Sequence, residues 1–430
     1  MNSKLISLVA AARSIALVSP QVRSNLLLDF ANLITEKSDF ILEENQRDLK
    51  AVSAELSTPL VARLKLDKNK LSQLVQGILA IAKSTDPIGQ VLEQTILDDG
   101  LVLDKVRVPL GVVGVIFESR PDVLPQLIAL AIRSGNALAL KGGREAKYSN
   151  EAFLSCLQIA LERHLEIPCD FIALFHEREI VDEMLKATEI FSLIIPRGSY
   201  EMVKSIMERS LVPVLGHAEG VCHIYIDKDA DLKKAVELSL DSKIQYPAAC
   251  NAVETLLINR VVARQFLADF SQVALENNVK LKGSEEVIGY LPDAEAVSDQ
   301  DWSREYSDLV LNLKIVGSVS EAVTHINRYG SHHTDAIISE NQEIVEDFLS
   351  SVDSACVFAN CSTRFCDGFR FGLGAELGIG TGKIHARGPV GIEGLLTYKY
   401  KLRGSGQLVK SYVGQKAKEF RHSRVGTQLK

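Results

Sequence analysis

The feature that most constrains this fold is a repeated alternation of short apolar runs with amphipathic segments, from Gly111 to residue 359. Alternation of strands with helices predicts a mainly parallel sheet that is covered on both faces. After residue 250 the pattern continues, which indicates a second α/β domain with its own sheet. The predicted strands are Val112–Phe117, Ala137–Leu140, Phe171–Leu174, Phe191–Ile195, Cys222–Ile226, Val253–Ile258, Val310–Val316, Ala336–Ser339 and Cys356–Ala359.

Helices are predicted between these strands, because apolar residues recur there at three- and four-residue steps. The first 95 residues are predicted to be helical as well, at Gln21–Glu36 and Lys68–Ser84. A β-hairpin follows at Ile96–Arg107, turning at Asp98–Gly100. The helices among the strands are Pro125–Arg133, Asn150–Arg163, Ile180–Lys186, Ser199–Arg209, Leu232–Ile244, Ala263–Asn277, Ser318–Asn327 and Asn341–Val352.

The N-terminal segment admits two interpretations. Lys4, Arg13 and Arg23 precede the first acidic residue, Asp29, as in a mitochondrial transit peptide. Apolar residues at helical spacing, with Pro20 after them as a stop signal, favour instead an amphipathic helix packed on the domain. These apolar residues are Leu5, Leu8, Val9, Ala12, Ile15 and Ala16.

Composition excludes several classes of protein. The 430 residues are 46% hydrophobic and 24% charged, which is ordinary for a globular chain of about three domains. A net charge of −7 argues against general binding to nucleic acid. The longest strongly apolar run, Val108–Phe117, is about ten residues long, whereas a membrane-spanning helix needs ~20. We therefore expect neither a nucleic-acid partner nor a membrane span.

The C-terminal tail departs from this acidic balance. From Lys383 onward, 11 Lys and Arg residues face only Glu393 and Glu419, a local charge of +9 that leaves −16 for the rest of the chain. Such a tail suits an arm that touches nucleic acid, and it suits an arm that docks on an acidic neighbouring subunit equally well.

Cysteine usage indicates a reducing compartment. Seven cysteines, an odd number, are scattered at positions 156, 169, 222, 250, 356, 361 and 366, which does not fit a secreted disulfide framework. The even spacing of the last three fits no usual zinc or iron–sulfur pattern. The adjacent His332 and His333 are expected to point apart on a strand. We therefore expect a cytoplasmic protein without a bound metal.

The usual phosphate-binding fingerprints are absent from the sequence. Gly372–Gly378 reads GxGxxxG, one residue too long and far from an early strand, and no GxxxxGK[ST] occurs. Two other turns follow predicted strands, where open α/β sheets bind ligands. The two cations of Lys141–Arg144 (KGGR) suit a ribose 2′-phosphate, although a solvated turn is equally consistent with the spacing. Ile195–Ser199 opens a helix and offers free N–H groups to a phosphate.

Cys250 stands in a setting that suits a nucleophile. It lies between a predicted helix and a predicted strand, where Pro247 ends the helix and two alanines leave space around the thiol. Backbone N–H groups in such a turn are available to an oxyanion. The alternative is an inert buried cysteine, which is the commoner state of any given cysteine.

A glycine-rich segment follows, with nine glycines in the 27 residues from Gly368 to Gly394. So many glycines indicate unusual backbone angles or close approach to a ligand. Surface charges on a flexible loop are one interpretation of the cations in this region. Because Arg binds carboxylates and phosphates through a bidentate fork, an anionic substrate is the other. The cations are Arg364, Arg370, Lys383, His385 and Arg387.

Seven segments between about residue 110 and residue 400 are specific enough to compare with known families. They are Phe117–Asp122 (FESRPD), Lys141–Arg144 (KGGR), Ile195–Ser199 (IPRGS), Leu215–His223 (LGHAEGVCH), Pro247–Asn251 (PAACN), Asp367–Glu376 (DGFRFGLGAE) and His385–Pro389 (HARGP). In this order they resemble the gamma-glutamyl phosphate reductase family, which belongs to the aldehyde dehydrogenase superfamily.

The resemblance implies an α/β fold of the aldehyde dehydrogenase type, with two Rossmann-like three-layer α/β/α domains and an oligomerisation arm. The cofactor-binding domain would comprise residues 1–95 and 110–240, and the catalytic domain residues 241–385. The arm, residues 96–109 and 386–430, would pair the hairpin with the C-terminal tail. A homo-oligomer, dimer or tetramer, is implied, and glutamate 5-kinase is a possible partner.

The resemblance also implies a reaction, the NADPH-dependent reduction of L-glutamyl 5-phosphate to L-glutamate 5-semialdehyde and phosphate, the second step of proline biosynthesis. Cys250 would carry a thioester, with Asn251 beside it and the oxyanion held mainly by the backbone N–H at Cys250. The cofactor residues would be Lys141, Gly143, Arg144, Gly198, Ser199 and Glu305. The substrate residues would be Arg120, Asp122, Arg364, His385 and Arg387.

Two positions depart from related sequences. Bacterial members of the family usually have Asn where this chain has Asp122, which is similar to the reductase half of pyrroline-5-carboxylate synthase; an ionised acid cannot donate to an oxyanion. His217 stands about where aldehyde-oxidising relatives use a Glu to activate water, and Glu219 lies nearby.

The alternatives in function are NAD-linked oxidation of another small aldehyde and a non-catalytic scaffold.

Overall fold

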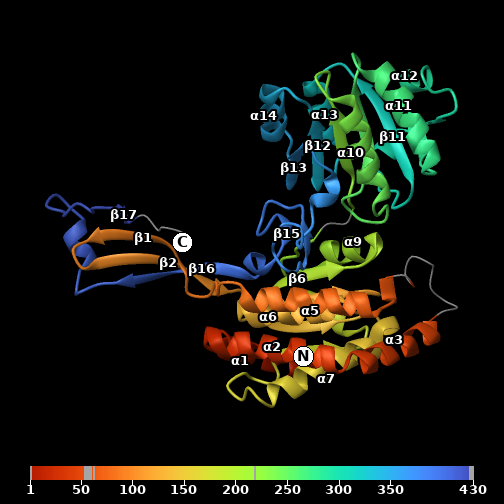
Figure 1. Cartoon of the computed structure of the whole chain (residues 1–430). Coiled ribbons are helices and arrows are strands. Elements are labelled where there is room, and N and C mark those ends of the chain that lie inside the picture. The colour runs from red at the N-terminus through yellow and green to blue at the C-terminus, as the bar shows by residue number, and fades with distance from the viewer. Residues whose placement is uncertain (1, 53–60, 62, 217–218, 426–430) are drawn as a thin grey trace. The chain divides into compact units, whose positions relative to one another are not determined.

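The computed structural model describes residues 2–52, 61, 63–216 and 219–425. The chain divides into two compact units, each with its own parallel sheet (Figure 1). The first unit comprises Met1–Gly198, Arg209–Val214 and Gly391–Lys430. The second unit comprises Ser199–Glu208 and Leu215–Val390.

The main sheet of the first unit has four strands in the order β5-β4-β3-β6, and all its pairs are parallel. The chain passes outward from β3 through β4 to β5 and then returns to place β6 on the other side of β3. The strand order therefore reverses at β3, and open α/β sheets bind ligands at such a reversal. The strands, all four of them predicted, are β3 (Val112–Phe117), β4 (Ala137–Lys141), β5 (Ile172–Phe175) and β6 (Phe191–Arg197).

Helices α1 and α6 pack on this sheet, and α2, α3, α5 and α7 pack on them and on one another. Leu5, Leu8 and Ile15 of the first helix are fully buried, which confirms the predicted packed helix. Pro20 is the first residue of the second helix, where its missing N–H is no loss. The helices are α1 (Ser3–Ile15), α2 (Pro20–Glu36), α3 (Ser38–Val52), α5 (Lys68–Lys83), α6 (Val123–Ser134), α7 (Lys147–Leu161) and α8 (Ile180–Lys186).

Within the described ranges, no single helix has the length and apolar character needed to cross a membrane. Helices α1 and α2 meet that criterion only as a pair, and the pair is bent by 119°.

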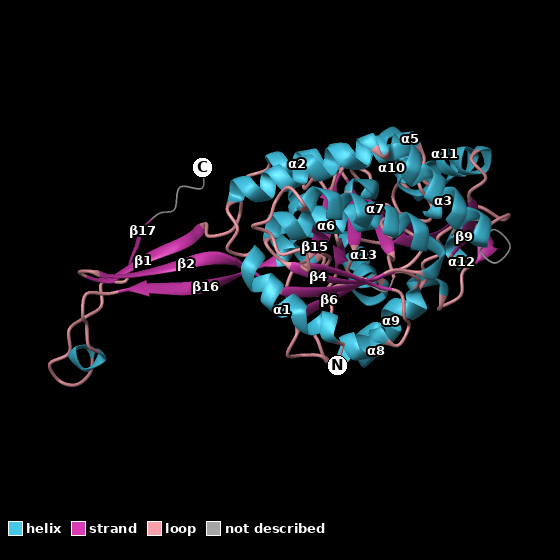
Figure 2. Ribbon diagram, turned by 90° about the horizontal axis from the view of Figure 1, so that it is seen from below, coloured by secondary structure: helices cyan, strands magenta, loops and turns pink. Residues whose placement is uncertain are grey.

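The first unit also carries an antiparallel sheet, the arm, in which the hairpin pairs with the C-terminal tail (Figure 2). The predicted pairing of these two segments is confirmed. Arginines of the tail form ion pairs with acids of the hairpin, as Arg403 does with Asp104 and Arg424 with Glu93. The basic tail is thus docked on acidic residues of its own chain. The strands are β1 (Val91–Asp98), β2 (Leu101–Pro109), β16 (Leu396–Arg403) and β17 (Ser423–Val425).

The second unit is built on a seven-stranded parallel sheet in the order β10-β9-β11-β8-β7-β12-β13. Five of its strands were predicted, and the short β9 and β10 were not. The strands are β7 (Cys222–Ile226), β8 (Val253–Asn259), β9 (Lys280–Gly283), β10 (Glu295–Ala296), β11 (Val310–Val316), β12 (Thr334–Ile338) and β13 (Cys356–Ala359).

Both faces of this sheet are buried, because alternate residues of one strand enter different cores. Ile224 packs with Phe266 of α11, whereas its neighbour Tyr225 packs with Phe348 of α14. This accounts for the apolar runs that marked the strands in the sequence. The helices are α9 (Tyr200–Arg209), α10 (Leu232–Ile244), α11 (Ala263–Glu276), α12 (Glu285–Ile288), α13 (Val319–Tyr329) and α14 (Gln342–Ser351).

The units correct two of the expected boundaries. The cofactor-binding domain was expected to extend to residue 240, but β7 pairs with β8 and β12 and is therefore a central strand of the second sheet. The arm was expected to begin at residue 386, but β15 (Gly388–Val390) pairs with β14 (Gly378–Gly380) inside the second unit. Strand–helix alternation does not reveal which sheet a strand joins, and this is the physical source of the first error.

Candidate active site

Three loops meet at the carboxyl edge of the first unit's sheet, because parallel strands end at the same edge. They follow β3 (residues 118–122), β4 (residues 142–144) and β6 (residues 198–199). The backbone N–H of Glu118 donates to the carbonyl of Arg197 at 3.0 Å, which ties the first loop to the end of β6. This edge holds Arg120, Asp122, Gly143, Arg144, Gly198 and the last residue of β4, Lys141; Ser199 follows Gly198 directly and is counted in the second unit.

Glu145 fastens the loop after β3 to the turn after β4. Its Oε1 accepts hydrogen bonds from the backbone N–H of Ser119 at 2.7 Å and from the Ser119 hydroxyl at 2.8 Å. A Cβ atom on Gly143 would lie 2.0 Å from the same Oε1, so only glycine leaves the carboxylate room to reach Ser119. The structure thus brings the turn predicted for the cofactor beside the loop that carries Arg120 and Asp122.

Lys141 and Arg144 present two cations in different states. Lys141 is half-buried, its Nζ donates to the carbonyl of Gly142 at 2.6 Å, and burial lowers its pKa. Arg144 is exposed at the start of a short 3-10 turn, Arg144–Ala146. A Cβ atom on Gly142 would lie 2.7 Å from Nδ2 of Asn150, so the backbone between the two cations is closely packed against Asn150. Two cations flank two glycines whose backbone is not covered by side chains of their own, and this arrangement suits a phosphate.

Asp122 lies at the N-cap position of α6 but makes no capping hydrogen bond with its side chain. An ionised carboxylate is stabilised at this end of a helix, where the free N–H groups give a partial positive charge. Arg120 and Asp122 belong to the first unit, whereas Arg364, His385 and Arg387 belong to the second.

Cys250 lies at the opposite kind of edge, the amino edge of the second unit's sheet. It is half-buried in the turn between α10 and β8, as predicted. Gly220, two residues before β7, lies directly against it, because a Cβ atom there would be 1.8 Å from the carbonyl oxygen of Cys250. Cys222, the first residue of β7, donates its thiol to the same carbonyl at 3.3 Å. The backbone of Cys250 is therefore held from one side by a glycine and a cysteine.

The turn at Cys250 leaves backbone donors available. Ala249 and Ala252 donate their N–H groups to the carbonyls of Tyr246 and Ala249, at 3.1 and 2.9 Å. Cys250 and Asn251 lie between these two alanines in the chain, and their N–H groups have no hydrogen-bond partner among the described residues. Two adjacent N–H groups beside a thiol can hold the oxyanion of a tetrahedral intermediate.

Asn251 is an anchor of this turn. Its side chain is 4% exposed, and its Nδ2 donates to the carbonyl of Cys366 at 2.6 Å. Its own carbonyl accepts from the hydroxyl of Thr363 at 2.7 Å. Asn251 was predicted to be one of the catalytic groups, whereas these contacts show that its side chain positions the turn on residues 363–366.

Glu305 is tied to the same backbone. Its Oε2 accepts from the N–H of Gly220 at 2.7 Å, and its Oε1 from the hydroxyl of Ser307 at 3.3 Å. Burial and the charge of Glu305 raise the pKa of the neighbouring Glu219. His217, for which the sequence analysis noted the loss of a water-activating Glu, lies outside the described residues.

The three predicted substrate cations of the second unit differ in their contacts. Arg364 is 8% exposed, donates from Nε to Oε1 of Gln245 at 2.8 Å, and is electrostatically coupled to Cys250. Arg387 donates from Nη2 to the carbonyl and carboxylate of Asp353, both at 3.1 Å, so it is already paired. His385 is exposed. Of the three, Arg364 is the one that is both nearly buried and in electrostatic interaction with Cys250.

A buried ion pair brackets the Cys250 turn, and the sequence analysis missed it. Nζ of Lys243, near the end of α10, donates to Oε2 of Glu254 in β8 at 2.8 Å, and both side chains are fully buried. Burial raises the pKa of Glu254 to about 8, although the ammonium of Lys243 lowers it. Opposite charges at positions seven residues before and four residues after Cys250 give no periodic signal, so only the fold reveals the pair.

In the part of the chain that the structure describes, no group of three or more His, Cys, Asp or Glu side chains is arranged to hold a metal ion. The adjacent histidines lie in the turn before β12 rather than on a strand, which corrects the prediction. Nδ1 of His332 lies 2.6 Å from the carbonyl of Asp353, and Nδ1 of His333 lies 2.8 Å from the hydroxyl of Thr334.

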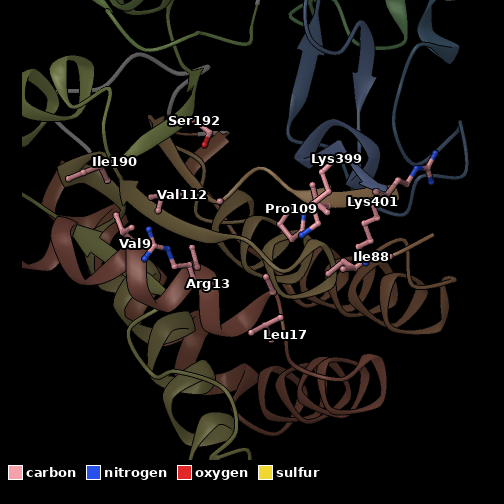
Figure 3. Close-up of a pocket in the computed structure, with 16 residues that line it drawn as sticks. Val9, Arg13, Leu17, Ile88, Pro109, Val112, Ile190, Ser192, Lys399 and Lys401 are labelled. Carbon is pink, nitrogen blue, oxygen red and sulfur yellow. The ribbon is translucent and has the colours of Figure 1, made fainter. Parts of the chain in front are cut away.

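A cavity of about 580 Å³ lies at the amino edge of the first unit's sheet (Figure 3). Val112 and Ser192, near the starts of β3 and β6, line it together with Val9 and Leu17 of the N-terminal region. Cations including Lys399 join this largely apolar wall, but the lining residues include neither a thiol nor a carboxylate. This cavity was not predicted, and none of the site residues predicted from the sequence lines it.

Comparison with known proteins places the chain in a family. A model of the aldehyde dehydrogenase family matches residues 7–288. Gamma-glutamyl phosphate reductase of Trichormus variabilis is 47% identical over 413 residues, which cover 96% of this chain and 95% of that protein. The protein of the same name from Brachyspira hyodysenteriae is 45% identical over 431 residues, covering 98% and 100%.

A solved structure gives the same result. The crystal structure of gamma-glutamyl phosphate reductase from Thermotoga maritima superposes with a TM-score of 0.91 at 36% identity, covering 94% of this chain and 98% of that one. The predicted α/β fold is thereby confirmed. The chain belongs to the aldehyde dehydrogenase family and, within it, to the gamma-glutamyl phosphate reductases.

Proposed function

We propose that this chain reduces L-glutamyl 5-phosphate to L-glutamate 5-semialdehyde and phosphate with NADPH, the second step of proline biosynthesis. The observation that carries the proposal is the half-buried thiol of Cys250 beside two backbone N–H groups without a partner among the described residues. The substrate is proposed from relatives that match this chain over nearly its full length and bear the name gamma-glutamyl phosphate reductase.

Cys250 is the nucleophile in this proposal. Its thiolate attacks the carbonyl carbon of the acyl phosphate, and the charge that develops on the carbonyl oxygen is held by the N–H groups of Cys250 and Asn251. Phosphate then leaves with the electrons of the C–O bond, and a thioester remains on Sγ. NADPH, when bound, supplies the hydride that reduces this thioester. Sγ departs as the aldehyde carbonyl forms again.

The turn after β4 fits a nicotinamide dinucleotide with a 2′-phosphate. Enzymes of the aldehyde dehydrogenase family use nicotinamide cofactors. Lys141 and Arg144 supply two cations above a backbone that side chains at Gly142 and Gly143 would obstruct. We assign the 2′-phosphate to these cations, because guanidinium and ammonium groups bind phosphate well.

Two further parts of the cofactor are assigned to other segments. The pyrophosphate is assigned to Gly198 and Ser199, which precede α9, a helix of ten residues with free N–H groups at its first turn. The nicotinamide ribose is assigned to Glu305, whose carboxylate the N–H of Gly220 holds close to the Cys250 turn.

The substrate's anionic groups are assigned to Arg120, Arg364 and His385. Arg364 has the strongest support, because it is nearly buried and is coupled to the charge of Cys250. Arg387 is assigned to holding its loop through Asp353 rather than to the substrate. Asp122 cannot donate to an oxyanion while ionised, and we assign it to the α-ammonium of the substrate.

Water must not hydrolyse the thioester in a reductase. Glu219 is the carboxyl closest in sequence to the position of the water-activating Glu of aldehyde-oxidising relatives. Burial and the charge of Glu305 raise its pKa, so the ionised form, which is the form that could act as a base, is less favoured than in an ordinary glutamate. This agrees with transfer of the acyl group only to hydride or to phosphate.

We further propose a cytoplasmic location, because the mechanism needs a free thiol. The arm is proposed to form a homo-oligomer, dimer or tetramer, since the aromatic side chains of Tyr398 and Tyr400 on β16 are 49% and 59% exposed. Glutamate 5-kinase, which makes the labile acyl phosphate, is the proposed supplier of the substrate.

The function is tested in the reverse direction. Purified protein is mixed with L-glutamate 5-semialdehyde, phosphate and either NADP⁺ or NAD⁺, and the nicotinamide absorbance is followed. The proposal expects reduction of NADP⁺ that depends on phosphate or arsenate. Steady turnover without either anion would instead support the alternative, NAD-linked oxidation of an aldehyde.

The scaffold alternative is tested with Cys250→Ser. The variant is expected to lose activity by at least about 10³-fold while its circular dichroism and unfolding midpoint stay those of the wild type. Cys361→Ser, which alters a thiol outside the turn, is the control and is expected to keep its activity. Unchanged activity of Cys250→Ser would remove Cys250 from the mechanism.

A further inference from the structure

Four of the seven cysteines gather at the amino edge of the second unit's sheet. Cys222 begins β7, Cys356 begins β13, and Cys366 follows the short 3-10 turn at Thr363–Phe365. Sγ of Cys366 lies 3.5 Å from Sγ of Cys356, and Cys250 packs against this pair. The proposed mechanism uses only one of these thiols, so two thiols in contact remain without a role.

We propose that Cys356 and Cys366 are a modification site, a dithiol that hydroperoxides oxidise to a disulfide, and that this disulfide slows catalysis. The formation of the bond does not depend on the proposed function. Its effect on catalysis does, because that effect is exerted on the turn of Cys250.

The contacts assign different roles to the two sulfurs. Cys366 donates its S–H to Sγ of Cys356, and this hydrogen bond and the cation of Arg387 lower the pKa of Cys356. Burial and the same partner raise the pKa of Cys366. Cys356 is also 8% exposed, whereas Cys366 is fully buried. Because the thiolate is the nucleophile, Cys356 meets the peroxide and Cys366 resolves the product.

The reaction balances with hydrogen peroxide as the oxidant. The thiolate of Cys356 attacks one peroxide oxygen, the O–O bond breaks, the other oxygen leaves as hydroxide, and Cys356 becomes a sulfenic acid. The sulfur of Cys366 then attacks the sulfur of Cys356, the S–O bond breaks, and the thiol proton leaves with that oxygen as water. Two electrons pass from the two sulfurs to the peroxide, and a dithiol such as dithiothreitol returns them.

The consequence for catalysis follows from Asn251. Its Nδ2 is held by the carbonyl of Cys366 at 2.6 Å, and it directly follows Cys250 in the chain. A disulfide requires a sulfur separation of about 2.05 Å, so Cys366 and Cys356 must move together from contact distance. Residue 366 then pulls on the side chain that positions the turn, and misplacement of a nucleophile by about 1 Å costs on the order of 10²-fold in rate.

The chemical part is tested without reference to activity, in the Cys250→Ser variant. The folded variant is treated with hydrogen peroxide, blocked with an alkylating reagent and digested. The expected product is a peptide pair joined through Cys356 and Cys366 that dithiothreitol separates. Survival of both as alkylated thiols would overturn the proposal. In wild-type protein, a link of either cysteine to Cys250 would overturn it as well.

The proposed effect of the disulfide on catalysis is tested by comparing the rates at which hydrogen peroxide inactivates the wild type and Cys356→Ala. Both are expected to start with the same activity, and the half-life of the wild type is expected to be shorter by at least about threefold. Cys361→Ala, a neighbouring thiol outside the cluster, is expected to behave as wild type. Equal half-lives for wild type and Cys356→Ala would overturn the link to catalysis; Cys356→Ser replaces the alanine variant if the latter folds poorly.

Discussion

The carboxyl edge of the first unit's sheet and the amino edge of the second unit's sheet are built from different materials. At the first, loops end in glycines and cations, with Lys141 and Arg144 above a bare backbone. At the second edge, Cys222 and Cys356 begin strands, and Gly220 lies directly against the backbone of Cys250. Free N–H groups and cations suit reversible binding of phosphates, whereas thiols fixed by backbone contacts suit covalent chemistry.

The edge of a parallel sheet therefore does not determine what that edge does. Open α/β sheets generally bind ligands at their carboxyl ends, and the cofactor site proposed for the first unit lies at that end. In the second unit the reactive thiol precedes β8, where the residues around it are anchored by the starts of buried strands. We expect variants at the amino edge to alter rate or stability, and variants at the carboxyl edge to alter cofactor affinity.

The largest effect is expected from Lys243→Met, at the amino edge. It leaves the buried carboxyl of Glu254, whose pKa is already raised to about 8, without its hydrogen-bond partner, which costs about 3 kcal/mol of unfolding free energy. Urea unfolding followed by the fluorescence of Trp302, the single tryptophan, reports on the second unit. Lys234→Met on the same helix, whose ion pair with Glu340 is exposed, is the control and should cost below about 1 kcal/mol. Equal losses of unfolding free energy in the two variants would show that the buried Lys243–Glu254 pair does not stabilise the second unit.

Gly220→Ala is expected to lower kcat by about 100-fold, because a Cβ atom 1.8 Å from the carbonyl of Cys250 must displace the turn. Steady-state kinetics of semialdehyde oxidation measure the effect. Gly317→Ala is the matched control, since its Cβ would only touch flexible ends of side chains at 3.4 Å. A normal kcat for Gly220→Ala would show that the turn tolerates movement.

Arg144→Ala, at the carboxyl edge, is expected to raise KM for NADPH about 10- to 100-fold and to leave kcat and KM for NADH unchanged, because one charge-assisted contact to the 2′-phosphate is lost. Initial rates with both cofactors measure the change. Lys147→Ala removes an exposed cation three residues away and is the control. A fall in kcat with unchanged KM would break the division of tasks between the two edges.

The smallest effect concerns acid stability of the second unit. Burial and the cations of Lys314 and Arg328 lower the pKa of His325 to about 2, and Nζ of Lys314 lies 3.0 Å from its Nδ1. Since the unfolded chain takes up a proton below pH 6.5 and the folded chain does not, stability falls as pH falls.

Between pH 7 and pH 5.5, wild type is therefore expected to lose about 1 kcal/mol more unfolding free energy than His325→Gln, which has no proton to bind. Urea titrations at the two pH values give the difference. Equal losses in the two proteins would show that His325 does not carry the acid sensitivity.

Much of the fold followed from the sequence, because most strands are buried on both faces and appear as apolar runs. Their assignment to sheets did not follow: β7 was placed in the wrong domain, since partners of a strand are set by packing and not by order. The short β9 and β10 lack an apolar run and were missed.

The candidate site was predicted unevenly for a similar reason. Lys141–Arg144 and Cys250 could be proposed from the sequence because each lies in a turn next to a strand, which is a local signal. Gly220, Cys222 and Cys366 act through contacts with residues distant in the chain, so no local pattern marks them. Gly220, one of two glycines in the Leu215–His223 block, was the available hint of a close backbone approach.

The central claim is that Cys250 carries the acyl group as a thioester that water does not release. The most direct test mixes the protein rapidly with L-glutamate 5-semialdehyde and NADP⁺ in the absence of phosphate. We predict a burst of about one NADPH per active site that then stops, resumes on addition of phosphate, and is absent in Cys250→Ser. Continuous NADPH production without phosphate, or a burst in Cys250→Ser, would contradict the account.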